Sequence, residues 1–117
     1  MSVTIYHNPK CSKSRQTLEL LKEQGIAPDI IEYLKSPPTA EQLQAILAQL
    51  GLVPRDLMRK KEDIYAECEL DNPSLTDVEL VNFMISHPIL IERPIILANG
   101  KAAIGRPPEQ VLEILST

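Results

Sequence analysis

The chain has 117 residues, of which 44% are hydrophobic and 24% charged, and its formal net charge at pH 7 is −4. This length and composition fit one globular domain, spanning residues 1–117, with its own hydrophobic core. The acidic balance and an aromatic content of only 3% argue against nucleic-acid binding, which relies on cationic surfaces and stacking rings.

The sequence carries no visible targeting signal. No apolar stretch approaches the roughly 20 residues that a membrane-spanning helix needs, so we expect no membrane association. The chain does not open with a basic segment followed by a long apolar run, so we expect no secretory signal. Its two cysteines lie far apart in the sequence, which fits a reducing compartment, and we therefore expect a cytoplasmic protein.

The first predicted elements are a strand, a loop and the start of a helix. A β-branched run from Val3 to Tyr6 predicts the strand, Asn8-Pro9 predicts a turn, and Cys11 stands at the head of a helical pattern. A helix start carries unpaired N–H groups and a partial positive charge, so it stabilises a thiolate over a thiol. We interpret Cys11 as a reactive thiolate, with a buried structural cysteine as the alternative.

The charges around Cys11 favour the same interpretation. No acidic residue precedes Glu19, so the opening segment is basic in an acidic chain. The basic neighbours are His7, Lys10, Lys13 and Arg15. Positive neighbours favour a thiolate, and a thiolate in such surroundings is suited to meet an anion.

The spacing after Cys11 is C-x-x-S, with Ser14 where a C-x-x-C redox pair has its second thiol. A disulfide cannot form within this motif, so any resolving thiol must come from elsewhere. The other cysteine, Cys68, lies between Glu67 and Glu69, and we expect it to be unreactive. The sequence therefore predicts a single functional thiol.

The middle of the chain is predicted to be helical after one further strand. Gly25 ends the first helix, and residues 29–33 predict the second strand. Capping boxes that begin at Thr39 and Thr76 predict two helices, with short helices and loops over residues 52–74 between them.

The last third of the chain predicts a hairpin and a closing helix. Residues 95–98 and 101–104 predict two strands joined by a type I′ turn at Asn99-Gly100. The closing helix is expected to place on one face Val111, Leu112 and Leu115. The order β-α-β and then β-β-α predicts an α/β, thioredoxin-like fold, with a helical insertion over roughly residues 38–88.

Three arginines are candidates for binding an anion. Arg93 precedes the third strand and Arg106 precedes the closing helix, whereas Arg59 lies in the irregular segment. In the predicted fold, Arg93 and Arg106 share one end of the sheet with Cys11. A guanidinium group carries a planar fork of donors that matches an oxyanion, so converging arginines would form an anion pocket beside the sulfur. The alternative for each arginine is a solvated surface charge.

These motifs resemble, in register along the whole chain, those of the glutaredoxin-dependent arsenate reductases, the ArsC branch of the ArsC/Spx family. The resemblance is carried by Tyr6-His7-Asn8-Pro9-Lys10-Cys11-Ser12-Lys13-Ser14-Arg15, Tyr33-Leu34 with Pro37-Pro38-Thr39, Leu57-Met58-Arg59-Lys60, His87-Pro88-Ile89-Leu90-Ile91 with Arg93-Pro94-Ile95, and Gly105-Arg106-Pro107. It implies a thioredoxin-like fold with an inserted helical segment. One departure is Ser12, because the better-known members have glycine after the cysteine.

The resemblance also implies roles for individual residues. Cys11 would be the nucleophile, and His7 would help to hold its thiolate. Pro94 would be the cis-proline of the family. The ligands of the oxyanion would be Arg59, Arg93 and Arg106.

The implied activity is the reduction of arsenate to arsenite through a covalent thiol–arsenate adduct on Cys11. Glutathione would act as co-substrate on this adduct, and glutaredoxin would clear the glutathionylated cysteine. No bound cofactor is implied. We expect no metal site either, because zinc-ligand spacing is missing among the soft ligands His7, Cys11, Cys68 and His87.

Two other classes of function stay open. A monothiol glutaredoxin-like oxidoreductase would use Cys11 on glutathione mixed disulfides, and it would need a groove for a tripeptide rather than a small cationic site. A regulator resembling Spx would bind RNA polymerase without catalysis. Such regulators commonly carry C-x-x-C as a redox switch, so Ser14 disfavours this second alternative.

Overall fold

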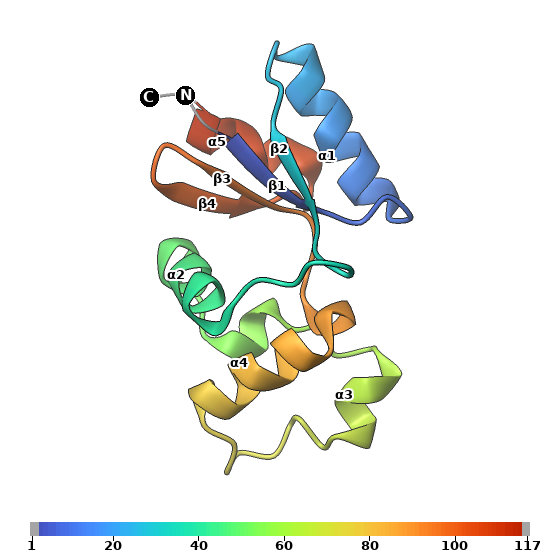
Figure 1. The fold of residues 1–117 in the computed structure, drawn as a ribbon, viewed down its shortest axis with the longest axis vertical. Coiled ribbons are helices and arrows are strands. Elements are labelled where there is room, and N and C mark those ends of the chain that lie inside the picture. Colours follow the sequence, from blue (N-terminus) through green and yellow to red (C-terminus); the bar gives the residue numbers. More distant parts are fainter. Residues whose placement is uncertain (1–2, 116–117) are drawn as a thin grey trace. The chain divides into compact units, whose positions relative to one another are not determined.

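The computed structural model describes residues 3–115 and forms two compact units (Figure 1). Unit 1 contains the residues up to Ser36 together with those from Arg93 onward, and unit 2 is Pro37–Glu92. The helical insertion expected over roughly residues 38–88 falls within unit 2.

Unit 1 contains the sheet and the helices at the two ends of the sequence. Its elements are β1 Val3–His7, α1 Ser12–Glu23, β2 Asp29–Glu32, β3 Ile95–Ala98, β4 Lys101–Ile104, the 3-10 helix η3 Pro108–Val111 and α5 Leu112–Leu115. Unit 2 is helical. Its elements are α2 Ala40–Leu50, η1 Pro54–Leu57, α3 Asp63–Glu67, α4 Asp77–Ser86 and η2 Pro88–Leu90.

The strands of unit 1 form one mixed sheet in the order β2-β1-β3-β4 (Figure 1). β1 runs parallel to β2, to which α1 connects it, and β3 runs antiparallel to both β1 and β4. Asn99 and Gly100 have φ angles of 55° and 73°, as the predicted type I′ turn requires. This β-α-β and β-β-α arrangement is the thioredoxin-like fold expected from the sequence.

The core of unit 1 lies between the sheet and the helices α1 and α5, which come from the two ends of the sequence. Side chains alternate along β1, so that every second residue turns towards α1 and α5. The buried members of this core are Val3, Ile5, Leu21, Ile96, Ala98, Val111 and Ile114. Burial of this apolar cluster fixes α1, and with it the loop at the start of the helix, against the sheet.

The closing helix differs from the sequence-based expectation. It begins as the 3-10 helix η3, in which three residues complete a turn, and continues as α5. Pro108, Val111 and Ile114, spaced three apart, are therefore the buried residues. The prediction that Leu112 shares the buried face was wrong, because that prediction assumed the α-helical period, and Leu112 is only half-buried.

Local signals define the helices of unit 2. Thr39 and Thr76 form the predicted capping boxes with Gln42 and Glu79. Gly51 ends α2 with a φ of 69°, a conformation that glycine adopts without steric cost. Every helix between residues 3 and 115 is too short or too polar to cross a membrane.

Candidate active site

The loop between β1 and α1 presents Cys11 at the start of the helix. Asn8 shapes this loop, because its Oδ1 accepts a hydrogen bond from the Lys10 N–H and its carbonyl accepts one from the Cys11 N–H, both at 3.0 Å. Cys11 is the N-cap of α1, with extended backbone angles (φ −94°, ψ 124°). Its carbonyl accepts the Arg15 N–H at 3.0 Å as the first helical hydrogen bond. The N–H groups of the first turn therefore remain available to the cysteine side chain.

The Cys11 sulfur lies among hydrogen-bond donors that stabilise its anion. The donors are the backbone N–H groups of Ser14 and Lys13 and the side chain of Arg93, and Arg106 Nη2 lies 3.6 Å from Sγ. Burial raises the pKa of this thiol, and the residue is only 9% exposed. The hydrogen bonds and the charge of Arg93 outweigh burial, so the pKa of Cys11 is lowered from its ordinary value.

The source of this lowered pKa differs from the sequence-based argument. That argument gave part of the effect to the charges of Lys10, Lys13 and Arg15. The groups that lower the pKa of Cys11 are backbone N–H groups and Arg93, and the three exposed side-chain charges are not among them. The orientation of the helix start, rather than the basic composition of the segment, favours the thiolate.

Ser14 connects His7 to the loop that holds the sulfur. Ser14 is fully buried. Its Oγ lies 2.5 Å from His7 Nδ1, and the same oxygen accepts a hydrogen bond from the Asn8 N–H at 3.1 Å. Burial lowers the pKa of His7 by more than the Glu32 carboxylate raises it, so the neutral imidazole is favoured. Ser14 thus contacts His7 through its side chain and the Cys11 sulfur through its backbone N–H.

Arg93 and Arg106 approach Cys11 from the far end of the sequence. Arg106 Nε donates to the Arg93 carbonyl at 2.7 Å, which holds the two residues together. Burial lowers the pKa of Arg93, but its hydrogen bonds and charge interactions with Cys11 and Tyr33 raise it by more, so the guanidinium stays charged. The structure thus brings Cys11, Arg93 and Arg106 together within unit 1.

Pro94 and Gly105 fix the backbone behind the two arginines. The peptide bonds that precede Pro94 and Pro107 are both cis, and the isomer at Pro94 is the one that the family resemblance implied. The Gly105 N–H donates to the Pro94 carbonyl at 3.0 Å. A Cβ at residue 105 would lie 2.5 Å from Thr17 Oγ1 and 2.8 Å from Pro94 Cγ, closer than atoms can pack. This glycine therefore lets α1 press directly against the segment that carries Arg106.

Arg59, the third predicted anion ligand, lies in unit 2. Its Nη1 is 3.2 Å from Glu92 Oε1, and its Nε is 3.6 Å from Glu62 Oε1. Its backbone N–H donates to the Leu90 carbonyl at 2.7 Å. Within its own unit this arginine is thus engaged with two carboxylates, and its role towards an anion stays a prediction.

Three residues at this site were not identified from the sequence as functional. Asn8 was interpreted only as a turn residue, Ser14 only as the position of a missing thiol, and Tyr33 only as part of a motif. A signal for Ser14 was present, because Ser14, Thr17 and Leu21 share one face of α1 at helical spacing and are all buried. Small hydroxyl residues on the buried face of a helix imply a close backbone approach or a polar site there.

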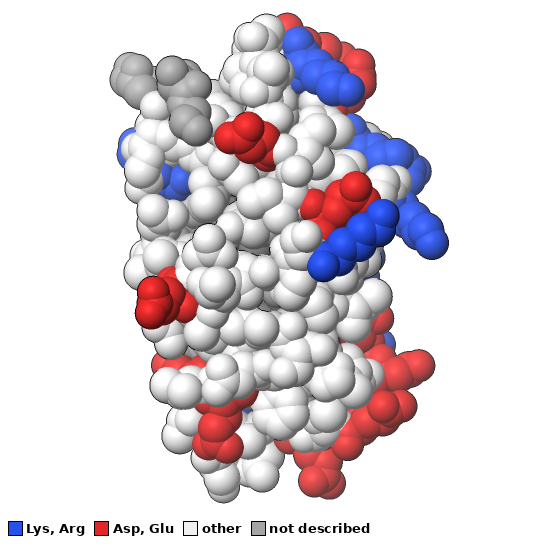
Figure 2. All heavy atoms as spheres, in the orientation of Figure 1, with Lys and Arg blue, Asp and Glu red and all other residues white. Residues whose placement is uncertain are grey.

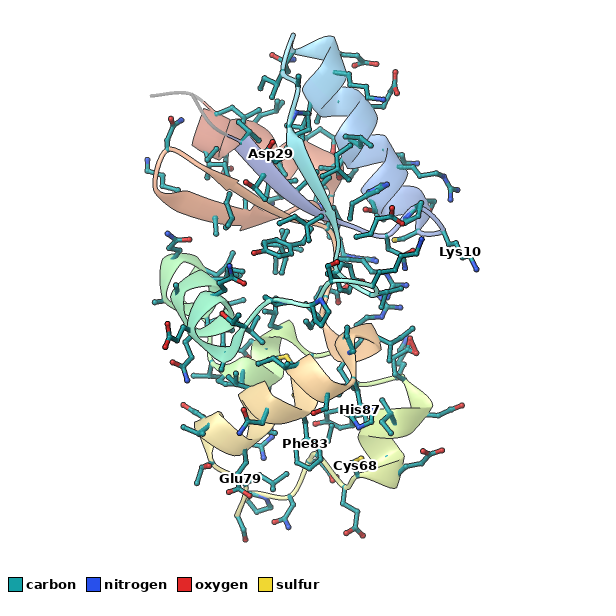
Figure 3. All side chains as sticks on the ribbon, viewed as in Figure 1. Lys10, Asp29, Cys68, Glu79, Phe83 and His87 are labelled. Atoms are coloured by element: carbon teal, nitrogen blue, oxygen red, sulfur yellow. The ribbon has the colours of Figure 1, made fainter. Side chains whose placement is uncertain are left out.

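The remaining cysteine and histidine, Cys68 and His87, belong to no metal-binding cluster in the described part of the chain. Between residues 3 and 115, no group of three or more His, Cys, Asp or Glu residues is placed to hold a metal ion. Cys68 is a half-buried free thiol that follows α3, and His87 follows α4 (Figure 3). Cys11 offers a thiolate with guanidinium groups beside it, an arrangement that can bind a small anion and attack it.

The chain is similar to known proteins along nearly its whole length. The ArsC family model matches residues 6–114. The chain is 55% identical to the uncharacterized protein YfgD of Escherichia coli K12 over 114 residues. This matched region covers 97% of this chain and 96% of YfgD. The chain is 50% identical over 114 residues to the arsenate reductase of Neisseria meningitidis serogroup A, and this match covers 97% of each of the two chains. The structure of the arsenate reductase from Vibrio cholerae has a TM-score of 0.95 and 57% identity to this chain, and covers 97% of this chain and 98% of its own.

Proposed function

The chain belongs to the ArsC family, and on this premise we propose that it is an arsenate reductase, an oxidoreductase that converts arsenate to arsenite. A relative at 50% identity over 97% of the chain carries that name. The observation that carries the proposal is the stabilised thiolate of Cys11, with Arg93 hydrogen-bonded to it and Arg106 3.6 Å away.

In the first step, the Cys11 thiolate attacks the arsenic atom of arsenate. The Sγ–As bond forms, and one arsenic-bound oxygen takes up protons and leaves as water. Thiolate and arsenate are both anions and repel each other, so the step needs cations that are already in place. Arg93 and Arg106 supply them, and a guanidinium fork matches two oxygens of the anion. On the family resemblance, we assign Arg59 the role of a further oxyanion ligand.

The second step needs a thiol from outside the chain, because C-x-x-S has no second cysteine. The thiolate of glutathione attacks Sγ of the adduct, so that an S–S bond forms and the S–As bond breaks. The electron pair of that bond stays on arsenic, which leaves as arsenite. Glutaredoxin then reduces the glutathionylated Cys11 and restores the thiolate. These steps use no bound metal or organic cofactor.

His7 and Ser14 act as positioning residues in this proposal. The buried hydroxyl of Ser14 holds the Asn8 N–H and His7 Nδ1, which fixes the loop around the sulfur. A fixed loop keeps the N–H groups of residues 13 and 14 aimed at Sγ before the substrate arrives.

The test is the formation of arsenite from arsenate by the purified protein, with glutathione and glutaredoxin supplied. We expect turnover to require all three additions, and glutathionylated Cys11 to accumulate, by mass spectrometry, when glutaredoxin is left out. Reduction of glutathione mixed disulfides without any arsenate turnover would instead indicate the monothiol oxidoreductase. Stable binding of RNA polymerase by a protein inactive in both assays would indicate the regulator.

A further inference from the structure

Three cations beside Cys11 have no part in stabilising its thiolate. We call Lys10, Lys13 and Arg15 the rim cations. Their side chains are exposed, and none of them forms an ion pair with an acidic residue in the described part of the chain. Figure 3 shows Lys10 projecting away from the loop between β1 and α1. Three exposed positive charges therefore lie in the segment around Cys11 and are not among the groups that lower the pKa of its thiol.

The backbone keeps the rim cations close to the sulfur. The Lys10 N–H is bound by the Asn8 side chain, and the backbone of Lys13 lies in the first turn of α1, where its own N–H serves the sulfur. Arg15 Nη1 donates to the Pro9 carbonyl at 2.9 Å, which folds its guanidinium back over the loop.

The rim cations stand out against an acidic chain. The net charge is −4, and the basic segment ends at Glu19, one turn of α1 beyond Arg15. Figure 2 shows Lys and Arg side chains projecting on the side of unit 1 that carries α1. The basic segment is thus local in the sequence, and Cys11 lies within it.

We propose that the rim cations form a docking surface for a small anionic thiol, one that carries carboxylates and reacts at the Cys11 sulfur. This inference rests on the proposed function, whose second step needs a thiol from outside. Cys11 is only 9% exposed, so the incoming thiol must reach the sulfur on a slender chain while its carboxylates stay at the surface. A local positive field raises the concentration of such an anion near Cys11.

The chemical step at this surface is thiol–disulfide exchange on Cys11. In one direction, the Cys11 thiolate attacks a disulfide, a new S–S bond forms, and the other sulfur leaves with the electron pair as a thiolate. In the other direction, an incoming thiolate attacks the Cys11 sulfur of the mixed disulfide, a new S–S bond to Cys11 forms, and the more acidic thiol of the reagent leaves with the electron pair. The rim cations act on the charged reactant in both directions.

The test compares an anionic and an uncharged disulfide of similar chemistry. The protein carries Cys68→Ser, so that only Cys11 reacts. The rate constants with 5,5′-dithiobis(2-nitrobenzoate), which is anionic, and with 4,4′-dithiodipyridine, which is neutral, are measured by absorbance. The rim variant is Lys10→Gln, Lys13→Gln and Arg15→Gln. The matched control removes three exposed lysines of unit 1 at other places, Lys22→Gln, Lys35→Gln and Lys101→Gln.

At low ionic strength, we expect the rim variant to react with the anionic disulfide about tenfold more slowly than the parent does. With the neutral disulfide, its rate constant should stay within about twofold of the parent's. The control variant should match the parent with both. Added salt should slow the parent with the anionic disulfide towards the rate of the rim variant, because charges are screened beyond about 10 Å at 0.1 M salt. This salt dependence needs no variant and tests the proposal even if the rim variant were to misfold.

A second arm uses the mixed disulfide that the anionic reagent leaves on Cys11. Glutathione, which carries carboxylates, should release it more slowly from the rim variant than from the parent, whereas uncharged 2-mercaptoethanol should not distinguish them. The proposal is overturned by equal slowing with charged and neutral reagents, by equal slowing in the control, or by no slowing. A rim variant impaired only towards glutaredoxin would overturn it too, because the surface would then dock a protein. No arsenate is used, so these outcomes are independent of arsenate turnover.

Discussion

Cys11 and Cys68 are the two cysteines of the chain, and they lie at opposite ends of helices. Cys11 is the N-cap of α1 and receives N–H groups of the following turn. Cys68 follows α3, and its own N–H is used in donating to the Ile64 carbonyl at 3.0 Å. A helix start offers donors to a negative sulfur, whereas a helix end offers carbonyl oxygens. The direction of the nearby backbone therefore gives the two thiols of the same chain different surroundings.

The largest expected effect comes from removing each sulfur in turn. Cys11→Ser should lower arsenate turnover by more than about 10³-fold, because a serine hydroxyl is not ionised at neutral pH. Cys68→Ser should stay within about twofold of the parent. The measurement is arsenite formation with glutathione and glutaredoxin, with circular dichroism as the control for folding. A Cys11–Cys68 disulfide found by mass spectrometry after one turnover would contradict the comparison.

The next effect concerns the two guanidinium groups beside Cys11, those of Arg93 and Arg106. Arg93→Ala or Arg106→Ala should each lower arsenate turnover about 10²–10³-fold, or about 2.7–4 kcal/mol of transition-state stabilisation. Arg→Lys at either position should recover only part of this rate, since a point charge does not reproduce the guanidinium fork. Alkylation of Cys68 serves as the internal control and should be unchanged. Parent-like turnover in both alanine variants would rule out the arginine site.

A smaller effect should follow from crowding the backbone behind the arginines. Gly105→Ala places a methyl group against Thr17 and Pro94, and should lower the free energy of unfolding by about 1–3 kcal/mol. Urea denaturation measures this loss. Adding Thr17→Ala removes the closest contact, so the double variant should show a coupling energy rather than additive losses. Strict additivity, or a Gly105→Ala variant as stable as the parent, would show that this contact relaxes freely.

The smallest expected effect is a shift in the pH dependence of Cys11 alkylation. In the Cys68→Ser background, the iodoacetamide rate should have its midpoint below about 8.5, and unfolding in urea should return it to that ordinary value. Because folding lowers the pKa of Cys11, its thiolate adds stability that is complete above the unfolded pKa and is lost as pH falls through the folded pKa. Arg93→Ala should raise the midpoint. A folded-state midpoint at or above 8.5 would contradict the comparison of the two cysteines.

The fold was predictable to the extent that its signals are local. The capping boxes at Thr39 and Thr76, the glycine at position 51 and the Asn99-Gly100 turn each act within a few residues, and each formed as expected. The closing helix was mispredicted in one respect, because the start of η3 as a 3-10 helix depends on how the chain packs against the sheet. Sequence periodicity alone assumes the α-helical spacing.

The sequence predicted several residues of the candidate site, but it did not predict what lowers the pKa of Cys11. The proximity of Cys11, Arg93 and Arg106 followed from the element ends at which they stand. The origin of the lowered pKa did not, because composition lists charges but not the direction in which N–H groups point. Ser14 was overlooked for a related reason, since its hydroxyl matters only through the partners that folding brings to it.

The contact between Cys11 and Arg106 joins residues 95 positions apart, and this has a consequence for the protein as it is made. A ribosome that has completed α1 has already built the helix start, whose N–H groups come from residues next to the sulfur. The guanidinium of Arg106, and the glycine that lets its segment press against α1, are translated about 95 residues after Cys11. A nascent chain therefore gains both arginines beside Cys11, and the core residues of β3, η3 and α5 that hold α1, only after translation has passed these later segments.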